Sequence, residues 1–263
     1  MTESPMTYLI FLCPEVSIIT MGHQARATFE IRDSIGIVTI DNPPQNRLDD
    51  PVFIEPALIQ RCSDDDGIKG LIFTGDGRHF SAGADMESLR RIAADESLFM
   101  ARLQAGKALL ESIEAISIPT IAAIEGACFG GGLEIALACH MRVCARNAIL
   151  AFPEVNHGLM PGMGGTVRLP GFIGFGRALE TVLSGDIIDA EHALEIGLAD
   201  HLAPSRKAMD FSIALMKKMV ADRPIEVIRS IVQSLNNGRT MAVSEAMEEE
   251  TKMFCRLAGK LHG

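Results

Sequence analysis

The sequence predicts an α/β fold with a helical C-terminal region, and three observations lead to this prediction. Short apolar runs rich in Ile and Val alternate with segments of helical periodicity up to about residue 200. Glycine-rich turns follow several of the apolar runs. After Pro204 the pattern changes to consecutive amphipathic helices. We therefore divide the chain into an N-terminal extension (1–26), an α/β core (27–204) and a helical C-terminal region (205–263).

The elements of the core follow from local patterns taken in chain order. The first strand-like segment has a turn signal at Asp33-Ser34 and ends at Pro43-Pro44. A glycine turn precedes the helix that contains Glu134. Strands are predicted at 27–44, 68–77, 118–126 and 141–152. Helices are predicted at 96–116 and, in the C-terminal region, at 208–224, 227–237 and 244–261.

Composition excludes several classes of protein. The chain has 263 residues, 48% of them hydrophobic, and a formal net charge of −10. This acidic balance argues against a nucleic-acid partner, and an anionic ligand would need a local site such as a helix N-terminus. The six cysteines form no CxxC pair and no zinc-finger spacing, so we interpret them as reduced residues and expect no metal.

The N-terminal segment 7–21 is apolar but does not match a secretion signal. It lacks a basic region ahead of it and is interrupted by Pro14-Glu15. Met21 is an alternative start, which would make the preceding residues an extension. No later segment is as long and apolar as a membrane span. We expect a cytoplasmic protein with no membrane partner.

Three glycine-containing stretches each place an acidic residue where a predicted strand ends. Ligand clefts in α/β folds usually lie at the carboxyl ends of strands, so these stretches are the candidate site. They are FSAGADMESL (80–89), GACFGGGLEIA (126–136) and FPEVNHGLMPGMGGTVRL (152–169).

Two of these stretches are suited to present backbone N–H groups to a ligand. The glycines before Glu134 allow a close approach of the backbone, and the helix start leaves N–H groups free. Residues 81–85 form a small-residue turn followed by Asp85, which can cap the next helix. Two N–H groups from different loops could converge on one oxygen as an oxyanion hole, each worth about 3 kcal/mol in the transition state.

Glu134 and Glu154 are candidate acid–base residues. Glu134 lies in the first turn of its helix, and Glu154 lies in the next loop. Two carboxylates over one pocket can hold a water and divide acid and base roles, because their repulsion favours protonation of one. The helix N-terminus favours ionised Glu134, so the sequence leaves open which glutamate carries the proton.

Other interpretations of these motifs are structural. An acid at a helix start often only complements the helix dipole, and Pro153-Glu154 could be an ordinary loop. The PGMGG segment lacks the GK[ST] ending of a phosphate loop, and no GxGxxG follows a first strand. His157 is interpreted as a loop residue, since no nucleophile signature accompanies it.

Together the motifs resemble the enoyl-CoA hydratase/isomerase (crotonase) family. The resemblance runs from about residue 27 to 204 through IDNPPQN, FTGDGRHFSAGADMESL, IPTIAAIEGACFGGGLEIALACHMRV, AFPEVNHGLMPGMGGTVRLPGFIG and LSGDIIDAEHALEIGLAD. It implies a crotonase-like spiral of ββα units, a C-terminal oligomerisation region, and a homotrimer or a hexamer of two trimers. It also implies an acyl-CoA substrate and no metal or redox cofactor.

The resemblance also implies roles for individual residues. It places the oxyanion-hole N–H groups at Ala84 and Gly131 and the catalytic acids at Glu134 and Glu154. The implied activity is reversible syn addition of water to a trans-2-enoyl-CoA. The implied substrate-binding residues are Ala82, Asp85, Met86, Glu87 and Gly162.

Alternatives remain within the resemblance. Isomerases of the family typically keep an acid at the Glu154 position and an apolar residue at the Glu134 position, and dienoyl isomerases add an Asp at the Gly162 position. Retention of both glutamates favours hydration, but fold alone does not determine chemistry. The alternatives are an isomerase, another acyl-CoA hydrolase or lyase, a dehydratase of carrier-protein-linked acyl groups, and a non-catalytic acyl-CoA or RNA binder. The sequence departs from the family pattern in two places. Arg47 stands where the family usually has a small residue, and the C-terminus is short.

Overall fold

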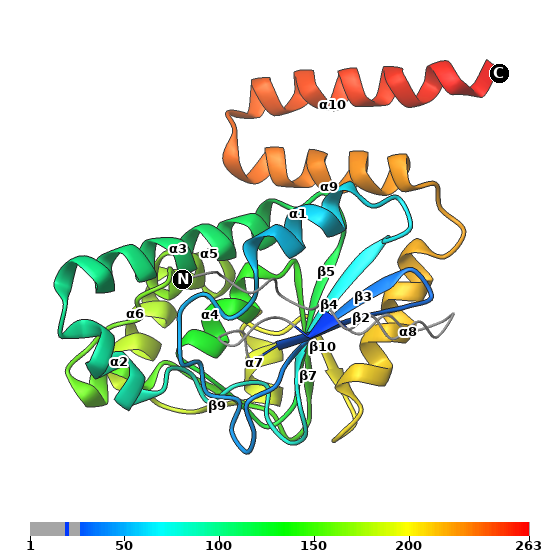
Figure 1. Cartoon of the computed structure of the whole chain (residues 1–263). Helices are drawn as coiled ribbons and strands as arrows, with labels where there is room; N and C mark the ends of the chain where they lie inside the picture. The colour runs from blue at the N-terminus through cyan, green and yellow to red at the C-terminus, as the bar shows by residue number, and fades with distance from the viewer. Residues whose placement is uncertain (1–18, 21–26, 263) are drawn as a thin grey trace, which may run out of the picture.

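Two β-sheets of unequal size lie at the centre of the structure, a computed structural model that describes residues 19–20 and 27–262 (Figure 1). The larger sheet has seven strands in the order β1-β2-β3-β4-β5-β7-β10, and the smaller has the order β6-β8-β9. The strands of the larger sheet are β1 (Ile19–Thr20), β2 (Ala27–Arg32), β3 (Ile35–Ile40), β4 (Gly70–Gly75), β5 (Thr120–Ile124), β7 (Met141–Ala145) and β10 (His201–Ala203). Those of the smaller sheet are β6 (Ala127–Phe129), β8 (Ile149–Ala151) and β9 (Ile188–Asp189).

Helices connect the strands and cover the sheets. From β3 to β10 neighbouring strands of the larger sheet are parallel, so each connection must return across the sheet, and each of these connections contains a helix. The helices of the core are α1 (Pro56–Asp64), α2 (Met86–Ala93), α3 (Glu96–Ala115), α4 (Gly131–Ala138), α5 (Gly165–Ile173), α6 (Phe175–Ser184), α7 (Ala190–Glu195) and the 3-10 turn η1 (Pro153–His157). The remaining helices are α8 (Ala208–Val220), α9 (Ile225–Thr240), α10 (Val243–Ala258) and the turn η2 (Gly259–His262).

The larger sheet separates two hydrophobic clusters, because successive strand residues point to opposite faces. Val38 and Phe73 belong to the cluster that includes α1, α3 and α4, whereas Ile37 and Ile72 belong to the cluster beneath α8. At Gly70 a Cβ atom would lie 2.4 Å from Met216 Sδ, so glycine permits the close approach of α8 to the sheet.

The turn predicted at Asp33-Ser34 is confirmed. Both residues have positive φ, 49° and 64°, and they join β2 and β3 in the two-residue turn that suits the twist of antiparallel strands.

The prediction of a single strand at 141–152 is wrong. Polar residues Arg146 and Asn147 form a turn there, β7 remains in the larger sheet, and β8 joins the smaller sheet. This turn directs the chain toward Glu154.

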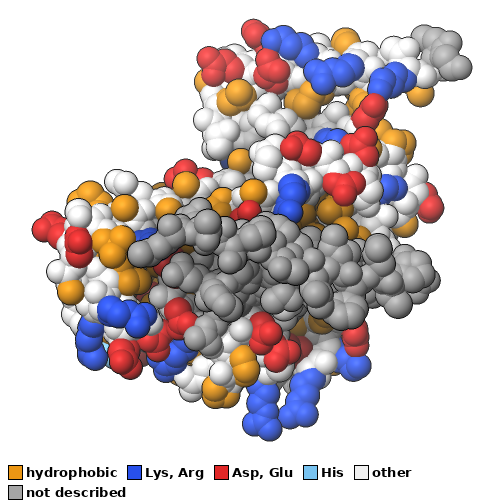
Figure 2. Space-filling view, viewed as in Figure 1, with side chains coloured by type: hydrophobic (Ala, Val, Ile, Leu, Met, Phe, Trp, Pro, Cys, Tyr) orange, Lys and Arg blue, Asp and Glu red, His pale blue; other side chains and the backbone are white. Residues whose placement is uncertain are grey.

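The C-terminal helices follow the predicted pattern but occupy different positions. α8 packs on β4, β5 and β7, whereas α9 buries Ile228 against the core and forms a hairpin with α10 that projects at this end of the molecule (Figure 1). Hydrophobic side chains appear among charged ones on this projecting part (Figure 2). Its large exposed apolar residues are Ile231, Leu235, Met241, Val243, Met247, Phe254 and Leu261. Within the described part of the chain, every helix is too short or too polar to cross a bilayer.

Candidate active site

Two loops at the carboxyl ends of β4 and β5 are held side by side by backbone hydrogen bonds. The Ser81 N–H donates to Ala127 O at 3.1 Å, and the Phe129 N–H donates to Ser81 O at 2.9 Å. Glycine is required at this contact, because a Cβ on Gly83 would lie 2.7 Å from Phe129 O. The loops that contain Ala84 and Gly131 are therefore fixed relative to each other.

The orientation of Ala84 follows from its β-bridge to Leu48. The Leu48 N–H donates to Gly83 O and the Asp85 N–H donates to Leu48 O, both at 2.9 Å. In a parallel bridge these flanking groups make the bonds, so the N–H of Ala84 itself points to the other side. Ala84 also lines a cavity.

Gly131 lines the same cavity as Ala84. It is the first residue of α4, where N–H groups have no acceptor within the helix. Gly130 precedes it with φ 48°, and a Cβ there would lie 2.6 Å from Glu154 Oε1, so both the turn and the neighbouring acid require glycine. The structure thus brings Ala84 and Gly131, the residues predicted to supply the N–H donors, onto one cavity.

Two cavities meet at this point. The first, about 600 Å³, has a mostly apolar lining made by Leu48, Pro51, Leu89, Ile92, Phe99, Leu103, Leu159, Met160 and Met163. The second, about 440 Å³, is lined by residues that include Gln45, Arg47, Ala82, Met86, Phe129 and His157. Ala84 and Glu154 line both cavities. An extended ligand could therefore pass from one cavity to the other beside the N–H donors and the acid.

Glu134 is a buried acid with only 2% of its surface exposed. Its Oε1 accepts hydrogen bonds from the Met163 N–H at 2.7 Å and the Gly165 N–H at 2.8 Å. Burial raises the pKa of Glu134, while these two N–H groups and the positive charges of Arg168 and Lys107 oppose that rise. The carboxyl group is thus held in one orientation by backbone donors.

Glu154 lies in the first turn of η1 and is half-buried. Its Oε2 is buried without a hydrogen-bond partner among the described residues. Burial raises the pKa of Glu154 to about 7, and the charge of Glu134 adds to the rise, whereas its own backbone N–H opposes it. A carboxyl group with this pKa can donate or accept a proton near neutral pH.

The predicted substrate-binding residues are distributed over both cavities. Ala82 and Met86 line the second cavity, and Asp85 and Gly162 line the first. Asp85 also caps α2, with Oδ1 accepting from the Ser88 N–H at 2.8 Å, and this bond is the main cause of its lowered pKa. Glu87 is exposed and outside both linings, so its role stays a prediction.

Sequence reasoning missed the partners of Glu134. The PGMGG segment, which contains the predicted substrate-binding residue Gly162 and lacks the ending of a phosphate loop, also donates two backbone N–H groups to this carboxyl. A glycine-rich segment followed by the start of α5 was the available signal, because such segments present free N–H groups. Sequence reasoning also did not identify Arg168 as a residue whose charge acts on Glu134.

Comparisons with known proteins agree with this fold and identify the family. The chain belongs to the enoyl-CoA hydratase/isomerase family, whose model matches residues 30–262. It is 35% identical over 223 residues to a probable enoyl-CoA hydratase of Bacillus subtilis, covering 84% of this chain and 85% of that protein. It is 36% identical over 245 residues to the fatty acid oxidation complex subunit alpha of Idiomarina loihiensis, covering 88% of this chain and 34% of that longer protein.

Solved structures show the same fold. An enoyl-CoA hydratase from Geobacillus kaustophilus superposes with a TM-score of 0.83 at 30% identity, covering 90% of this chain and 89% of that chain. Pseudomonas aeruginosa DspI superposes with a TM-score of 0.82 at 33% identity, covering 90% of this chain and 97% of that chain. The fold is therefore the crotonase fold with a helical C-terminal region.

Proposed function

We propose that the protein is an enoyl-CoA hydratase that adds water reversibly, with syn geometry, to a trans-2-enoyl-CoA. The observation that supports this proposal is that Glu134 and Glu154 line one cavity together with Ala84 and Gly131, the residues to which we assign the N–H donors. Hydration needs a base for water, an acid for carbon and donors for the thioester oxygen, and these four groups can supply all three functions.

The two cavities suggest how the substrate lies. The thioester would occupy the junction at Ala84, with its oxygen near the N–H groups of Ala84 and Gly131. The acyl chain would extend into the mostly apolar first cavity, and the pantetheine and nucleotide would follow the second. Arg47 lines the second cavity, where its positive charge suits a phosphate group.

The proposed mechanism uses one proton on the glutamate pair. Ionised Glu134 takes a proton from the water whose oxygen bonds to C3. The C2–C3 double bond opens toward the thioester, whose oxygen gains negative charge beside the two N–H donors. Protonated Glu154 then donates its proton to C2. The proton on Glu134 returns to Glu154 through solvent, which restores the pair. The reaction uses no metal or redox cofactor.

The pKa of Glu154 predicts the pH dependence of kcat/KM for hydration. Because burial raises this pKa to about 7, the pair keeps its proton up to neutral pH and loses it above. We expect kcat/KM to decrease by about tenfold per pH unit well above pH 7. Hydration and the reverse dehydration should show the same decrease, because the net reaction consumes no proton. A kcat/KM that rises steadily through pH 7 to 9 would contradict this mechanism.

Product analysis tests the proposed activity and its acyl preference. We expect crotonyl-CoA and longer trans-2-enoyl-CoA substrates to lose their conjugated-thioester absorbance and to gain the mass of one water. Because the first cavity is mostly apolar and about 600 Å³ in volume, kcat/KM should rise by up to about fourfold per added methylene until the cavity is filled. A product of unchanged mass would indicate isomerisation, and a preference for crotonyl-CoA over every longer substrate would contradict the acyl assignment.

The proposed assembly is a cytoplasmic homotrimer or hexamer. Exposed apolar side chains on α9 and α10, such as Leu235 and Phe254 at 67% and 70% exposure, support self-association of the hairpin. Sedimentation at micromolar concentration measures the assembly state directly.

A further inference from the structure

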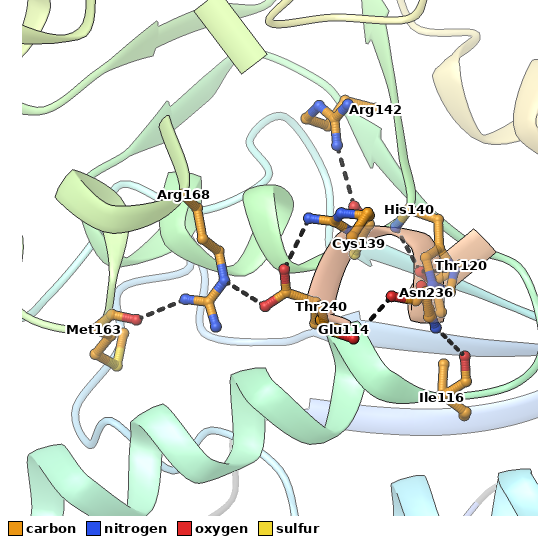
Figure 3. Close-up of polar contacts among 11 residues, drawn as sticks. Glu114, Ile116, Thr120, Cys139, His140, Arg142, Met163, Arg168, Asn236 and Thr240 are labelled. Carbon is orange, nitrogen blue, oxygen red and sulfur yellow. Dashed lines mark hydrogen bonds and ion pairs between the residues drawn. The ribbon is translucent and has the colours of Figure 1, made fainter. Parts of the chain in front are cut away.

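Arg168 occupies a mostly buried position behind the loop that anchors Glu134. It lies on α5, and its side chain is only 11% exposed. Its Nε donates to Glu114 Oε2 at 2.9 Å, and its Nη1 donates to Met163 O at 3.0 Å, so the guanidinium links a carboxylate to a backbone carbonyl (Figure 3). Burying a charged side chain is favourable only when such partners are present.

Glu114 has a position that requires partners. It lies in the last turn of α3, where the helix dipole disfavours negative charge. Its second oxygen, Oε1, accepts from Arg239 Nη2 at 2.9 Å, and Arg239 belongs to α9. Two arginines therefore hold one carboxylate, and this carboxylate fixes the guanidinium of Arg168.

Met163 connects this network to the candidate active site. Its N–H donates to Glu134 Oε1, while its carbonyl oxygen accepts from Arg168 Nη1. The next residue, Gly164, has φ 105°, and a Cβ there would lie 2.3 Å from Arg168 Nη1. The left-handed glycine thus leaves room for the guanidinium against the backbone that carries both donors to Glu134.

We infer that Arg168 is a positioning residue for Glu134: held by Glu114, it fixes the 163–165 backbone whose N–H groups anchor that carboxyl. Arg168 is absent from the described linings of both cavities, so it acts through Met163 and Gly165 rather than on the substrate. The catalytic meaning of this role rests on the proposed function. The groups whose charges act on Glu134 are Arg168 from α5, Lys107 from α3 and Glu154 from η1.

The test compares Arg168→Met with Arg168→Lys. Arg168→Met removes both hydrogen bonds and the positive charge, so kcat for enoyl-CoA hydration should decrease by about 10- to 100-fold with little change in KM. The acidic limb of kcat/KM, where Glu134 gains a proton, should move to higher pH, because burial raises the pKa of Glu134 and the positive charge of Arg168 opposes that rise. Arg168→Lys keeps the charge, so the limb should stay in place while kcat falls less.

Arg229→Met is the matched control. Arg229 also links a carboxylate, Asp66, and a backbone carbonyl, Ser63 O, each at 2.6 Å, but these partners belong to α1 and the turn after it and not to the 163–165 loop. We expect this variant to keep the wild-type kcat and pH profile. The inference is overturned if Arg168→Met keeps the wild-type kcat and acidic limb, or if both variants lose kcat equally without a change in the limb.

A readout independent of activity separates this inference from the proposed function. The amide of Gly165 donates to Glu134, so its nitrogen and proton NMR shifts should follow the ionisation of this carboxyl. Arg168→Met should move that titration to higher pH, and Arg229→Met should leave it unchanged. Inactivity of the wild-type protein toward enoyl-CoA substrates would reject the proposed function alone, whereas an unmoved Gly165 titration would reject the positioning role of Arg168.

Discussion

Glu154→Gln should lower kcat for enoyl-CoA hydration by about 10²- to 10⁴-fold while substrate binding persists. The substitution keeps the shape of the side chain but removes the proton that the mechanism delivers to C2. Its Oε2 has no hydrogen-bond partner among the described residues, so the amide disrupts no bond of the fold at that atom. Steady-state kinetics combined with direct titration of the substrate measures both quantities.

Stability provides a second readout of the same variant. Folding raises the pKa of Glu154 from 4.5 to about 7, so between these values only the unfolded state releases this proton, and the folded state loses stability until the loss becomes constant above about pH 7. Glu154→Gln should therefore have a higher Tm than the wild type at pH 8 and no such gain at pH 4. Glu180→Gln, at an exposed position on α6, is the control and should change neither kcat nor Tm. A loss of kcat below tenfold would contradict an acid role for Glu154.

Gly131→Pro should lower kcat by about 10²- to 10³-fold, because proline removes the N–H that we assign to the oxyanion hole. Gly131 is the first residue of α4, a position at which helices accept proline, so the helix itself should persist. Circular dichroism and acyl-CoA binding establish that the variant is folded.

Gly131→Ala is the matched variant because it keeps the N–H. Its Cβ would lie 3.1 Å from Leu48 Cδ1 and 3.2 Å from Met163 Cε, the ends of two flexible side chains that can shift. We expect Ala to reduce kcat far less than Pro. Equal activity of the Pro variant and the wild type would reject the oxyanion assignment, and so would equal losses in the Pro and Ala variants.

Much of the fold was predictable because its local signals are strong. The Asp33-Ser34 turn between two apolar runs determined the first hairpin, and helical periodicity identified α3 and the C-terminal helices. The single strand predicted at 141–152 failed because apolar periodicity continues across Arg146 and Asn147, whereas the change of sheet depends on tertiary packing. Periodicity alone cannot show that two consecutive strands belong to different sheets.

The candidate site was predictable where glycine and strand ends coincide. Ala84, Gly131, Glu134 and Glu154 were selected from such positions and from family resemblance, and the structure places all four on one cavity. The bonds that orient Glu134 were not predictable, because its donors are backbone groups 29 and 31 residues away in the chain. For the same reason, the network from Arg239 to Arg168 joins helices whose proximity no local pattern reveals.

The most direct test of this account is a crystal structure of the Glu154→Gln variant with a bound trans-2-enoyl-CoA. We predict that the thioester oxygen lies about 2.7–3.1 Å from the backbone nitrogens of both Ala84 and Gly131, with the acyl chain in the cavity beside Leu103 and Met163. A thioester bound away from these two nitrogens, or an acyl chain outside that cavity, would contradict the central claim that the reaction takes place where the two cavities meet.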